Sequence, residues 1–296
     1  MNIRNLQGSI VAIVTPFKDT GEIDLETFDE LIEFHIGNGT DGIVVCGTTG
    51  ETPTLSDAED AQMIERCVKK VNGRVPVIAG TGSNSTSDCI KYSKKAVELG
   101  ADALLIVSPY YNKPSRRGIY KHFSQVAKNV DAPIILYNVP GRTGSVIEPG
   151  TAIELACNHK NIIGIKEAGG DMNVFAELLA NRPEGFKVYS GDDFLSFPAN
   201  CMGADGCISV VANLIPADFH KMMKTSIDGD LKTARSLFFK YRILMQLMFL
   251  ESNPLPVKTA LALMGKVSEV FRAPLCEMED ENREQLKIEL KKLKLL

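Results

Sequence analysis

Residues 162–168 read Ile162-Ile163-Gly164-Ile165-Lys166-Glu167-Ala168, an aliphatic run that contains one lysine. Runs of this length and composition are typical of a strand buried on both faces of a parallel sheet. A lysine in such a strand must pair with an anion, point out of the open end of the sheet or lose its charge. Desolvation favours the neutral amine, which attacks carbonyl carbons and can form a Schiff base. An ion pair with Glu167 at the exposed end of the strand is the structural alternative.

Seven more aliphatic runs occur along the chain and alternate with segments of helical periodicity. Their starts are roughly 20 to 34 residues apart, which matches one strand–helix unit with short loops. Eight such units predict a closed (β/α)8 barrel, and the alternative, a doubly wound sheet, lacks a GxGxxG motif after its first strand. The expected strands cover residues 10–17, 42–47, 75–80, 103–108, 133–139, 162–168, 186–191 and 206–211.

The alternation stops after the eighth strand, and the rest of the chain has helical periodicity. The helices expected there cover residues 216–227, 231–250, 254–264 and 279–296. In the second of them, apolar side chains recur every three or four residues, which indicates a packed face. We therefore predict a catalytic barrel over residues 1–228 and a C-terminal helical domain over residues 229–296.

The composition is that of a globular protein, with 44% hydrophobic residues among 296 and a net charge of −4. This charge gives no reason to expect a nucleic-acid or membrane partner. The amino terminus lacks the apolar core of a signal peptide, and no apolar run is long enough to span a bilayer, so a cytoplasmic location is expected. The seven cysteines form no CxxC pair and the four histidines are far apart, so no metal site is expected.

In a barrel of this kind the active site lies at the carboxyl ends of the strands. The second strand ends in Gly47-Thr48-Thr49-Gly50-Glu51. Its glycines allow a ligand to approach the backbone closely, and free N–H groups could bind a small anion such as a carboxylate. A Thr-Gly turn that leads into the next helix explains the same residues without a ligand.

The fifth strand contributes Tyr137, with Ile135 and Val139 on the same side, so its phenol is expected to point into the barrel. There it could exchange a proton, with Thr49 as the candidate partner, or be an ordinary buried tyrosine. Arg142 follows on a Pro-Gly turn, where its guanidinium can bind a carboxylate in a bidentate manner or stay solvated.

Two further interpretations concern strands six and seven. A period of two places Ile162, Gly164 and Lys166 on one face, with Gly164 leaving space beside the lysine for a small substrate. After the seventh strand, Asp193 is the preferred helix N-cap, and the role of Asp192 stays open.

In this order, the motifs resemble the dihydrodipicolinate synthase branch of the pyruvate-dependent class I aldolase family, which includes N-acetylneuraminate lyase. The resemblance extends from about Gly8 into the C-terminal helices. It rests on Gly47-Thr48-Thr49-Gly50-Glu51, Tyr137-Asn138-Val139-Pro140-Gly141-Arg142-Thr143-Gly144, Gly164-Ile165-Lys166-Glu167-Ala168 and Asn253-Pro254-Leu255-Pro256-Val257-Lys258. The second threonine and the Arg-Thr-Gly turn point to the synthase branch rather than to the lyases.

The resemblance implies how the first substrate is handled. Lys166 would form a Schiff base with pyruvate, and Thr48 and Thr49 would hold the pyruvate carboxylate. Tyr137 would relay protons, with Thr49 connecting it to Tyr111 of the adjacent subunit. The iminium acts as the electron sink, so no metal and no organic cofactor is expected.

The resemblance also implies the second substrate, L-aspartate 4-semialdehyde. Arg142 would bind its carboxylate, and Ile208 would line the pocket with its backbone carbonyl. The enamine of pyruvate would attack the aldehyde, and cyclisation would release the lysine and give 4-hydroxy-tetrahydrodipicolinate, an intermediate of lysine and diaminopimelate biosynthesis.

Assembly and regulation are implied in the same way. A Tyr111 that works across an interface requires a dimer, and the family commonly forms a homotetramer of two tight dimers. Members inhibited by L-lysine bind it at the dimer interface, and Asp57 and Asp60 differ here from strongly inhibited members, so strong inhibition is not expected. The other corresponding positions are Thr52, Pro53, Asn84, Asp88 and Tyr110.

Two other functions are compatible with parts of the pattern. A Schiff-base lyase or aldolase for a 2-keto sugar acid would keep Lys166 and Tyr137, but Arg142 offers a carboxylate clamp rather than polyol contacts. A non-catalytic sensor homologue that binds a small ligand would be expected to lose the lysine or the tyrosine and to gain a DNA-binding segment. The chain keeps both residues and shows no such segment.

Overall fold

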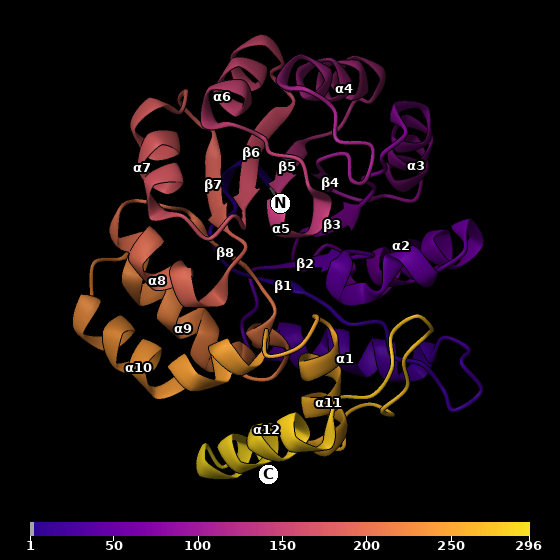
Figure 1. The fold of residues 1–296 in the computed structure, drawn as a ribbon, viewed down its shortest axis with the longest axis vertical. Helices are drawn as coiled ribbons and strands as arrows, with labels where there is room; N and C mark the ends of the chain where they lie inside the picture. Colours follow the sequence, from indigo (N-terminus) through magenta and orange to yellow (C-terminus); the bar gives the residue numbers. More distant parts are fainter. Residues whose placement is uncertain (1–2) are drawn as a thin grey trace.

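The computed structural model describes residues 3–296 as a closed barrel of eight parallel strands, paired in chain order and surrounded by helices (Figure 1). The expected (β/α)8 barrel with C-terminal helices is confirmed. The strands are β1 Gly8–Ala12, β2 Gly42–Val45, β3 Val77–Gly80, β4 Ala103–Val107, β5 Ile134–Asn138, β6 Ile162–Glu167, β7 Lys187–Ser190 and β8 Gly206–Ser209. The α-helices are α1 Leu25–Gly37, α2 Asp57–Val71, α3 Thr86–Glu98, α4 Arg116–Asn129, α5 Pro140–Thr143, α6 Pro149–Asn158, α7 Met172–Asn181, α8 Asp193–Cys201, α9 Pro216–Ile227, α10 Leu231–Leu247, α11 Leu255–Leu263 and α12 Asp280–Lys292.

The strands separate two apolar layers because successive side chains point to opposite faces. Ile10, Leu105 and Ile135 belong to the cluster that fills the barrel interior. Their neighbours Val11 and Leu104 belong to the larger cluster under the surrounding helices. The interior is therefore packed with side chains, which leaves the ends of the barrel as the places for a site.

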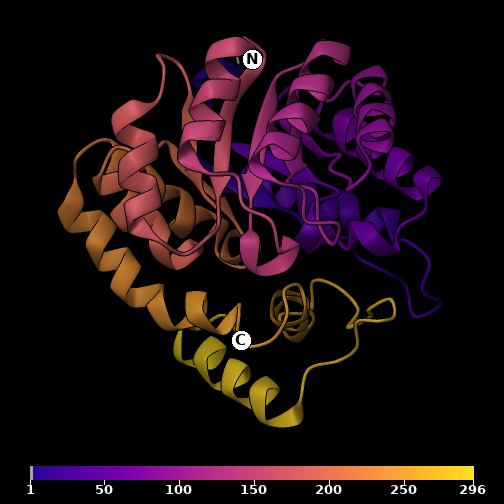
Figure 2. The ribbon, with the colours of Figure 1, turned by 45° about the horizontal axis from the view of Figure 1, so that its top comes forward.

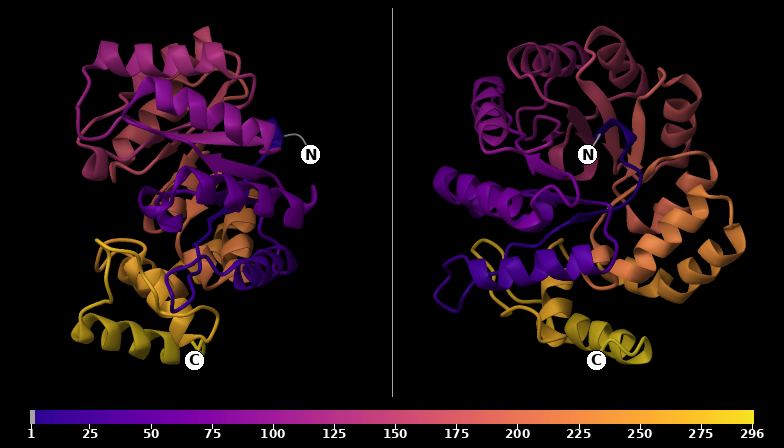
Figure 3. Two further views of the ribbon diagram at one scale, coloured as in Figure 1. Left: turned by 90° about the vertical axis from the view of Figure 1, so that its right-hand side faces the viewer. Right: turned by 180° about the vertical axis from the view of Figure 1, so that it is seen from behind.

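The amino end of the barrel is closed by residues 3–6. The short helix η1 Ile3–Asn5 lies there, and both Ile3 and Leu6 pack into the interior cluster. The Tyr189 hydroxyl donates to the carbonyl oxygen of Leu6 at 2.9 Å. The right-hand view of Figure 3 shows this end from behind, with the indigo chain around η1 in front of the barrel. The carboxyl end of the strands is thus the open one.

The C-terminal helices extend one side of the barrel. Helix α10 packs against α8 and α9, and α11 packs against α12 beyond the barrel wall (Figure 2). The connection from α10 to α11 passes the carboxyl ends of β2 and β5, since Asn253 contacts both Thr49 and Arg142 there. Among residues 3–296, no helix has the length and apolar character needed to cross a bilayer.

The strand bounds differ most from expectation at β1, which was predicted over residues 10–17. The strand begins earlier, at Gly8, whose partner in β8 is Gly206. A methyl group on Gly206 would lie 2.1 Å from the carbonyl oxygen of Gly8, so this close pairing requires glycine. The strand ends at Ala12, and the N–H of Val14 turns to the side-chain oxygen of Asn213 at 3.4 Å.

Candidate active site

Lys166 lies near the carboxyl end of β6 and points into the barrel. Its neighbour in the ladder is Tyr137 of β5, and the lysine Nζ lies 4.3 Å from the centre of the tyrosine ring. The lysine is only 5% exposed, yet it forms no ion pair with any carboxylate of residues 3–296. Glu167 points the other way, where it accepts hydrogen bonds from Asn138 Nδ2 at 2.8 Å and Gly169 N at 2.6 Å. The alternative of a Lys166–Glu167 ion pair is therefore wrong.

A register shift at the start of β6 changes which residues share a face with Lys166. Ile134 of β5 pairs with Ile162, but the next residue pairs with Gly164, so one residue of β6 is extra. Ile163 consequently lies in the interior cluster, and Ile162 packs under the helices. The predicted common face is confirmed for Gly164 and Lys166, which pair with the inward-facing Ile135 and Tyr137. It is wrong for Ile162, because a period of two does not continue through a bulge.

Two glycines near the lysine have separate steric roles. A methyl group on Gly164 would lie 2.7 Å from the carbonyl oxygen of Lys187, so this glycine permits close packing with β7 and was wrongly interpreted as space for a substrate. A methyl group on Gly191 would lie 2.7 Å from Lys166 Cε and 2.7 Å from Ala168 Cβ. Gly191, just after β7, is therefore the glycine that leaves room for the lysine side chain.

The loop after β2, residues 47–51, is called the threonine loop below. Thr48–Gly50 form one turn of 3-10 helix, and Glu51 follows in a left-handed conformation with φ 55°. No backbone or side-chain acceptor among the described residues takes the N–H groups of Thr48 and Thr49. Two consecutive free N–H groups at the mouth of the barrel can bind a small anion.

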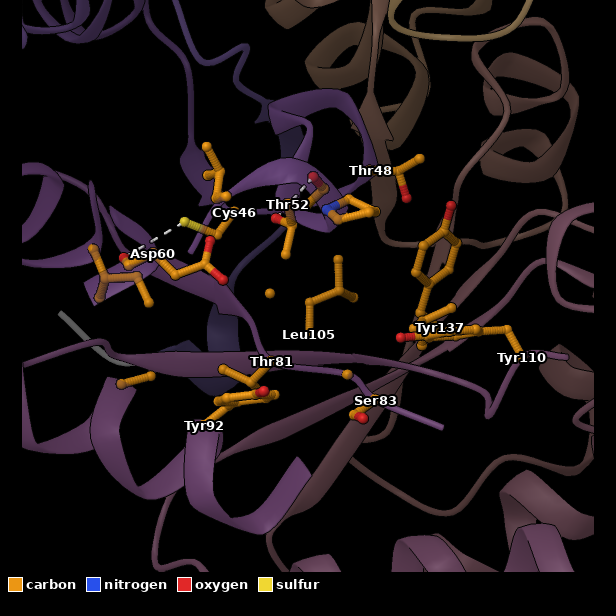
Figure 4. Close-up of a pocket in the computed structure, with 18 of the residues that line it drawn as sticks. Cys46, Thr48, Thr52, Asp60, Thr81, Ser83, Tyr92, Leu105, Tyr110 and Tyr137 are labelled. Atoms are coloured by element: carbon orange, nitrogen blue, oxygen red, sulfur yellow. Dashed lines mark hydrogen bonds between the residues drawn. The ribbon is translucent and has the colours of Figure 1, made fainter. Parts of the chain in front are cut away.

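A cavity of about 460 Å³ opens beside the threonine loop, and its walls include Thr48, Tyr137, Arg142 and Tyr110. In Figure 4 the hydroxyls of Thr48 and Tyr137 point toward each other across it. Thr49, the expected partner of Tyr137, is buried, and its Oγ1 accepts a hydrogen bond from Asn253 Nδ2 at 3.0 Å. The structure thus brings Thr48 to the tyrosine, and the expected pairing of Thr49 with Tyr137 is corrected.

Arg142 lies on α5, the short helix that follows β5. Its Nη2 donates to the backbone carbonyl oxygen of Asn253 at 3.2 Å, and the exposed residue lines the cavity. This arrangement leaves the arginine able to bind a carboxylate. Ile208 of β8 is buried in the interior cluster together with Tyr137, on the inner side of the site.

Tyr111 lies outside the cavity of its own chain. Its side chain is 88% exposed, and its backbone is left-handed with φ 70°. The loop is nevertheless held in place, since Tyr111 N donates to the carbonyl oxygen of Thr143 at 3.2 Å and Asn112 Nδ2 donates to that of Asn84 at 2.9 Å. A tyrosine presented in this way is available to a second subunit.

The positions expected for a regulatory lysine are only partly together. Tyr110, Asp57 and Asp60 line the cavity described above, and burial raises the pKa of Asp60 to about 7. Asn84 is half-buried outside its walls, and Asp88 is exposed in the first turn of α3. Asp57 is engaged by Lys91 at 2.7 Å. The candidate lysine site and the expectation that L-lysine does not inhibit strongly both stay predictions.

The C-terminal segment contributes contacts that sequence reasoning did not assign. Lys258 Nζ donates to Glu51 Oε1 at 2.6 Å, and both side chains are fully buried. The lysine also donates to the carbonyl oxygen of Val270 at 2.7 Å, and its Nζ lies 4.3 Å from the centre of the Phe17 ring. A lysine in the apolar stretch Leu255–Leu263 is the signal that could have identified this pair, by the argument used for Lys166.

One interpretation of the strand ends is reversed. Asp192, not Asp193, is the N-cap of α8, since its Oδ1 accepts from the N–H of Phe194 at 2.8 Å. Asp193 is buried, and its Oδ2 accepts from the N–H groups of Val210 at 3.2 Å and Val211 at 2.8 Å after β8. Over residues 3–296, no group of three or more His, Cys, Asp or Glu side chains is placed to hold a metal ion.

The geometry of a buried lysine beside a tyrosine, a threonine loop with two free N–H groups and a guanidinium agrees with comparisons of the chain with known proteins. The model of the dihydrodipicolinate synthetase family matches residues 5–293. The chain belongs to this family. The 4-hydroxy-tetrahydrodipicolinate synthase of Thermodesulfovibrio yellowstonii is 52% identical over 280 residues, which cover 95% of this chain and 96% of the relative.

Solved structures of family members share the complete fold. The crystal structure of dihydrodipicolinate synthase from Aquifex aeolicus is 46% identical, covers 98% of each chain and gives a TM-score of 0.96. The chloride-inhibited synthase of Acinetobacter baumannii, solved in complex with pyruvate, is 44% identical and covers 98% of this chain and 100% of its own, with a TM-score of 0.96. The expected family and its lyase class are therefore confirmed.

Proposed function

We propose that this enzyme condenses pyruvate with L-aspartate 4-semialdehyde through a Schiff base on Lys166 and gives 4-hydroxy-tetrahydrodipicolinate for lysine and diaminopimelate biosynthesis. The observation that carries the proposal is a buried lysine amine that faces Tyr137 and has no carboxylate partner among residues 3–296. With no ion pair to break, the amine can attack the keto carbon of pyruvate. The pyruvate complex of the Acinetobacter baumannii relative supports pyruvate as the first substrate.

The threonine loop binds the pyruvate carboxylate in this proposal. The free N–H groups of Thr48 and Thr49 supply two consecutive donors to the carboxylate, and Gly50 keeps the loop close to residues 13–15. In this proposal the backbone carbonyl of Ile208, which is buried in the barrel interior, lies on the inner side of the bound pyruvate. This arrangement directs the keto carbon toward Lys166.

Tyr137 exchanges the protons of imine formation. Its ring lies over the lysine amine, so its hydroxyl can donate a proton to the carbinolamine oxygen, which then leaves as water and yields the iminium. We assign the connecting hydroxyl to Thr48 rather than Thr49, since Thr48 faces the tyrosine across the cavity (Figure 4). Loss of a methyl proton from the iminium then gives the enamine.

Arg142 selects the second substrate. Its guanidinium holds the carboxylate of the semialdehyde, so that the enamine carbon can attack the aldehyde carbon and form the new C–C bond. The amino group of the adduct then attacks the imine carbon, and the C–N bond to Lys166 breaks. The lysine is released unchanged for another turnover.

The active assembly in this proposal is a homotetramer of two tight dimers. Tyr111 is held on an ordered loop but is exposed in the single chain, which supports its use in the site of an adjacent subunit. In that position its hydroxyl would extend the path from Tyr137 and Thr48 to solvent. The dimer is therefore the smallest unit with a complete site.

The test is reduction with borohydride in the presence of pyruvate, followed by intact mass measurement and peptide mapping. A pyruvate adduct on Lys166, together with turnover of L-aspartate 4-semialdehyde in a coupled assay, is the expected result. Lys166→Ala should abolish the adduct while the barrel stays folded. An adduct without turnover would redirect the assignment to 2-keto sugar acids. Reduction at another lysine would overturn the role of Lys166.

A further inference from the structure

Asn253 connects the two substrate-binding elements of the proposed site. It lies between α10 and α11 and is 6% exposed. Its side-chain Nδ2 donates to Thr49 Oγ1 at 3.0 Å, and its backbone carbonyl oxygen accepts from Arg142 Nη2 at 3.2 Å. One residue of the C-terminal segment therefore contacts both the threonine loop and the arginine.

Stability does not explain an asparagine at this position. Its Oδ1 is buried and has no hydrogen-bond partner among the described residues. A buried acceptor without a partner is destabilising, and an apolar side chain of similar shape would avoid that cost. The amide of Asn253 therefore indicates a role for its N–H group in the hydrogen bond to Thr49.

The amide N–H determines the direction of the Thr49 hydroxyl. An amide nitrogen can only donate, so the bond from Asn253 makes Thr49 Oγ1 an acceptor and leaves the hydroxyl proton for another group. The other end of the threonine loop is held by the buried Glu51–Lys258 pair. The loop is thus anchored to the C-terminal segment at Thr49 and again at Glu51.

We propose that Asn253 is a positioning residue for the pyruvate site: its side chain holds Thr49 and so orients the N–H groups of the threonine loop. Its carbonyl oxygen separately restrains Arg142. This inference rests on the proposed function, because it assigns the threonine loop to pyruvate and Arg142 to the semialdehyde. The two contacts use different parts of Asn253, which allows them to be separated by substitution.

Asn253→Ala removes the contact with Thr49 but keeps the backbone contact with Arg142. We expect the KM for pyruvate, and the pyruvate concentration for half-maximal borohydride trapping, to rise about tenfold, as for the loss of one hydrogen bond. The KM for the semialdehyde should stay within about twofold of wild type. The neighbouring Ser252 is exposed, so Ser252→Ala is the matched control and should change neither constant.

Asn253→Asp tests the direction of the hydrogen bond with almost no change in volume. A carboxylate accepts from Thr49 instead of donating, and its charge repels the pyruvate carboxylate, so its pyruvate KM should exceed that of Asn253→Ala. This variant also serves if the alanine variant does not fold. Melting temperatures measured beside the kinetics report whether each variant is folded.

Three outcomes would overturn the inference. The first is an unchanged KM for pyruvate in Asn253→Ala, and the second is a wild-type KM for pyruvate in Asn253→Asp. The third is an increase in the KM of both substrates that accompanies a fall in melting temperature. A wild-type enzyme that traps no pyruvate would instead remove the proposed function, and this inference with it. If the wild type traps pyruvate and the variants keep the wild-type KM for pyruvate, only the role of Asn253 is overturned.

Discussion

Two lysines of this chain are almost completely buried, and their partners give them different roles. Lys258 is fully buried and donates to the carboxylate of Glu51. Lys166 is 5% exposed, lies against the ring of Tyr137 and forms no ion pair among residues 3–296. The first is a structural cation, since its charge is compensated, and the second is available as a nucleophile. Burial alone therefore does not identify a reactive lysine, and its partner has to be known.

Gly191→Ala should disturb the lysine without unfolding the barrel. The added methyl group would lie 2.7 Å from Lys166 Cε and 2.7 Å from Ala168 Cβ, so the lysine must move. Misplacing a catalytic group by about 1 Å can lower a rate by about a hundredfold, and we expect a loss of this order in kcat. Steady-state kinetics and a melting curve check it. Gly37→Ala, where a methyl group meets nothing within 4 Å, is the control.

Arg142→Ala should separate the two substrates. Arg142 and Lys95 are the two cations of the cavity wall, and Arg142 is the one that we propose for the semialdehyde carboxylate. Removing one partner of such a pair raises the KM by about a hundredfold. Borohydride trapping with pyruvate alone should be nearly unchanged. Normal semialdehyde kinetics in this variant would contradict the assignment.

At the scale of elements, the buried pair joins the loop after β2 to helix α11. Burial lowers the pKa of Lys258, while Glu51 favours its charged form. In Lys258→Met the carboxylate of Glu51 would be buried without its partner, so the free energy of unfolding should fall by about 3–5 kcal/mol. Urea unfolding measures this loss. The double variant Glu51→Gln, Lys258→Met should recover much of it, and equal instability of both variants would argue against the pair as the cause.

A second link between elements is sensitive to pH. His220 of α9 donates from Nδ1 to Asp41 Oδ2 at 2.8 Å, next to the start of β2. The hydrogen bond to Asp41 raises the pKa of His220 above its ordinary value of 6.5. The protonated histidine is thus favoured in the folded state, so the stabilisation is complete below the unfolded pKa and is lost as pH rises through the folded pKa.

His220→Gln is the variant that measures this contribution. The wild type should be more stable than the variant by about 1 kcal/mol near pH 5.5, and by less near pH 9. Urea unfolding at the two pH values gives the difference. If the difference in the free energy of unfolding between wild type and His220→Gln increases as pH rises, the assignment is contradicted.

At the scale of the whole molecule, the proposed site is completed by a second subunit. Lys166→Ala and Tyr111→Phe lose function in different parts of the site. If Tyr111 acts across a two-fold interface, a mixed dimer has one complete site, and random pairing makes half of the dimers mixed. Coexpression of the two variants should therefore recover about a quarter of wild-type activity. Recovery no greater than the sum of the separate variants would place Tyr111 outside the partner's site.

Local patterns in the sequence were sufficient for the barrel and for selecting Lys166 and Tyr137 as candidate site residues. Eight aliphatic runs at regular spacing predicted eight strands, because a buried parallel strand must be apolar on both faces. Lys166 was conspicuous for the same reason, as a charge in such a run. Tyr137 was correctly placed in the interior with Ile135 and Val139, since β5 is regular there and alternation holds.

Tertiary structure decided the contacts that join segments far apart in the chain. The extra residue in β6 turned Ile163 inward, because strand pairing, and not composition, sets where a bulge occurs. Thr48 rather than Thr49 faces Tyr137, since the Thr49 hydroxyl is bound by Asn253, 204 residues away. Glu51 and its partner Lys258 are 207 residues apart. Periodicity describes only neighbours along the chain, so residue types alone could nominate these side chains, and folding alone determined which of them meet.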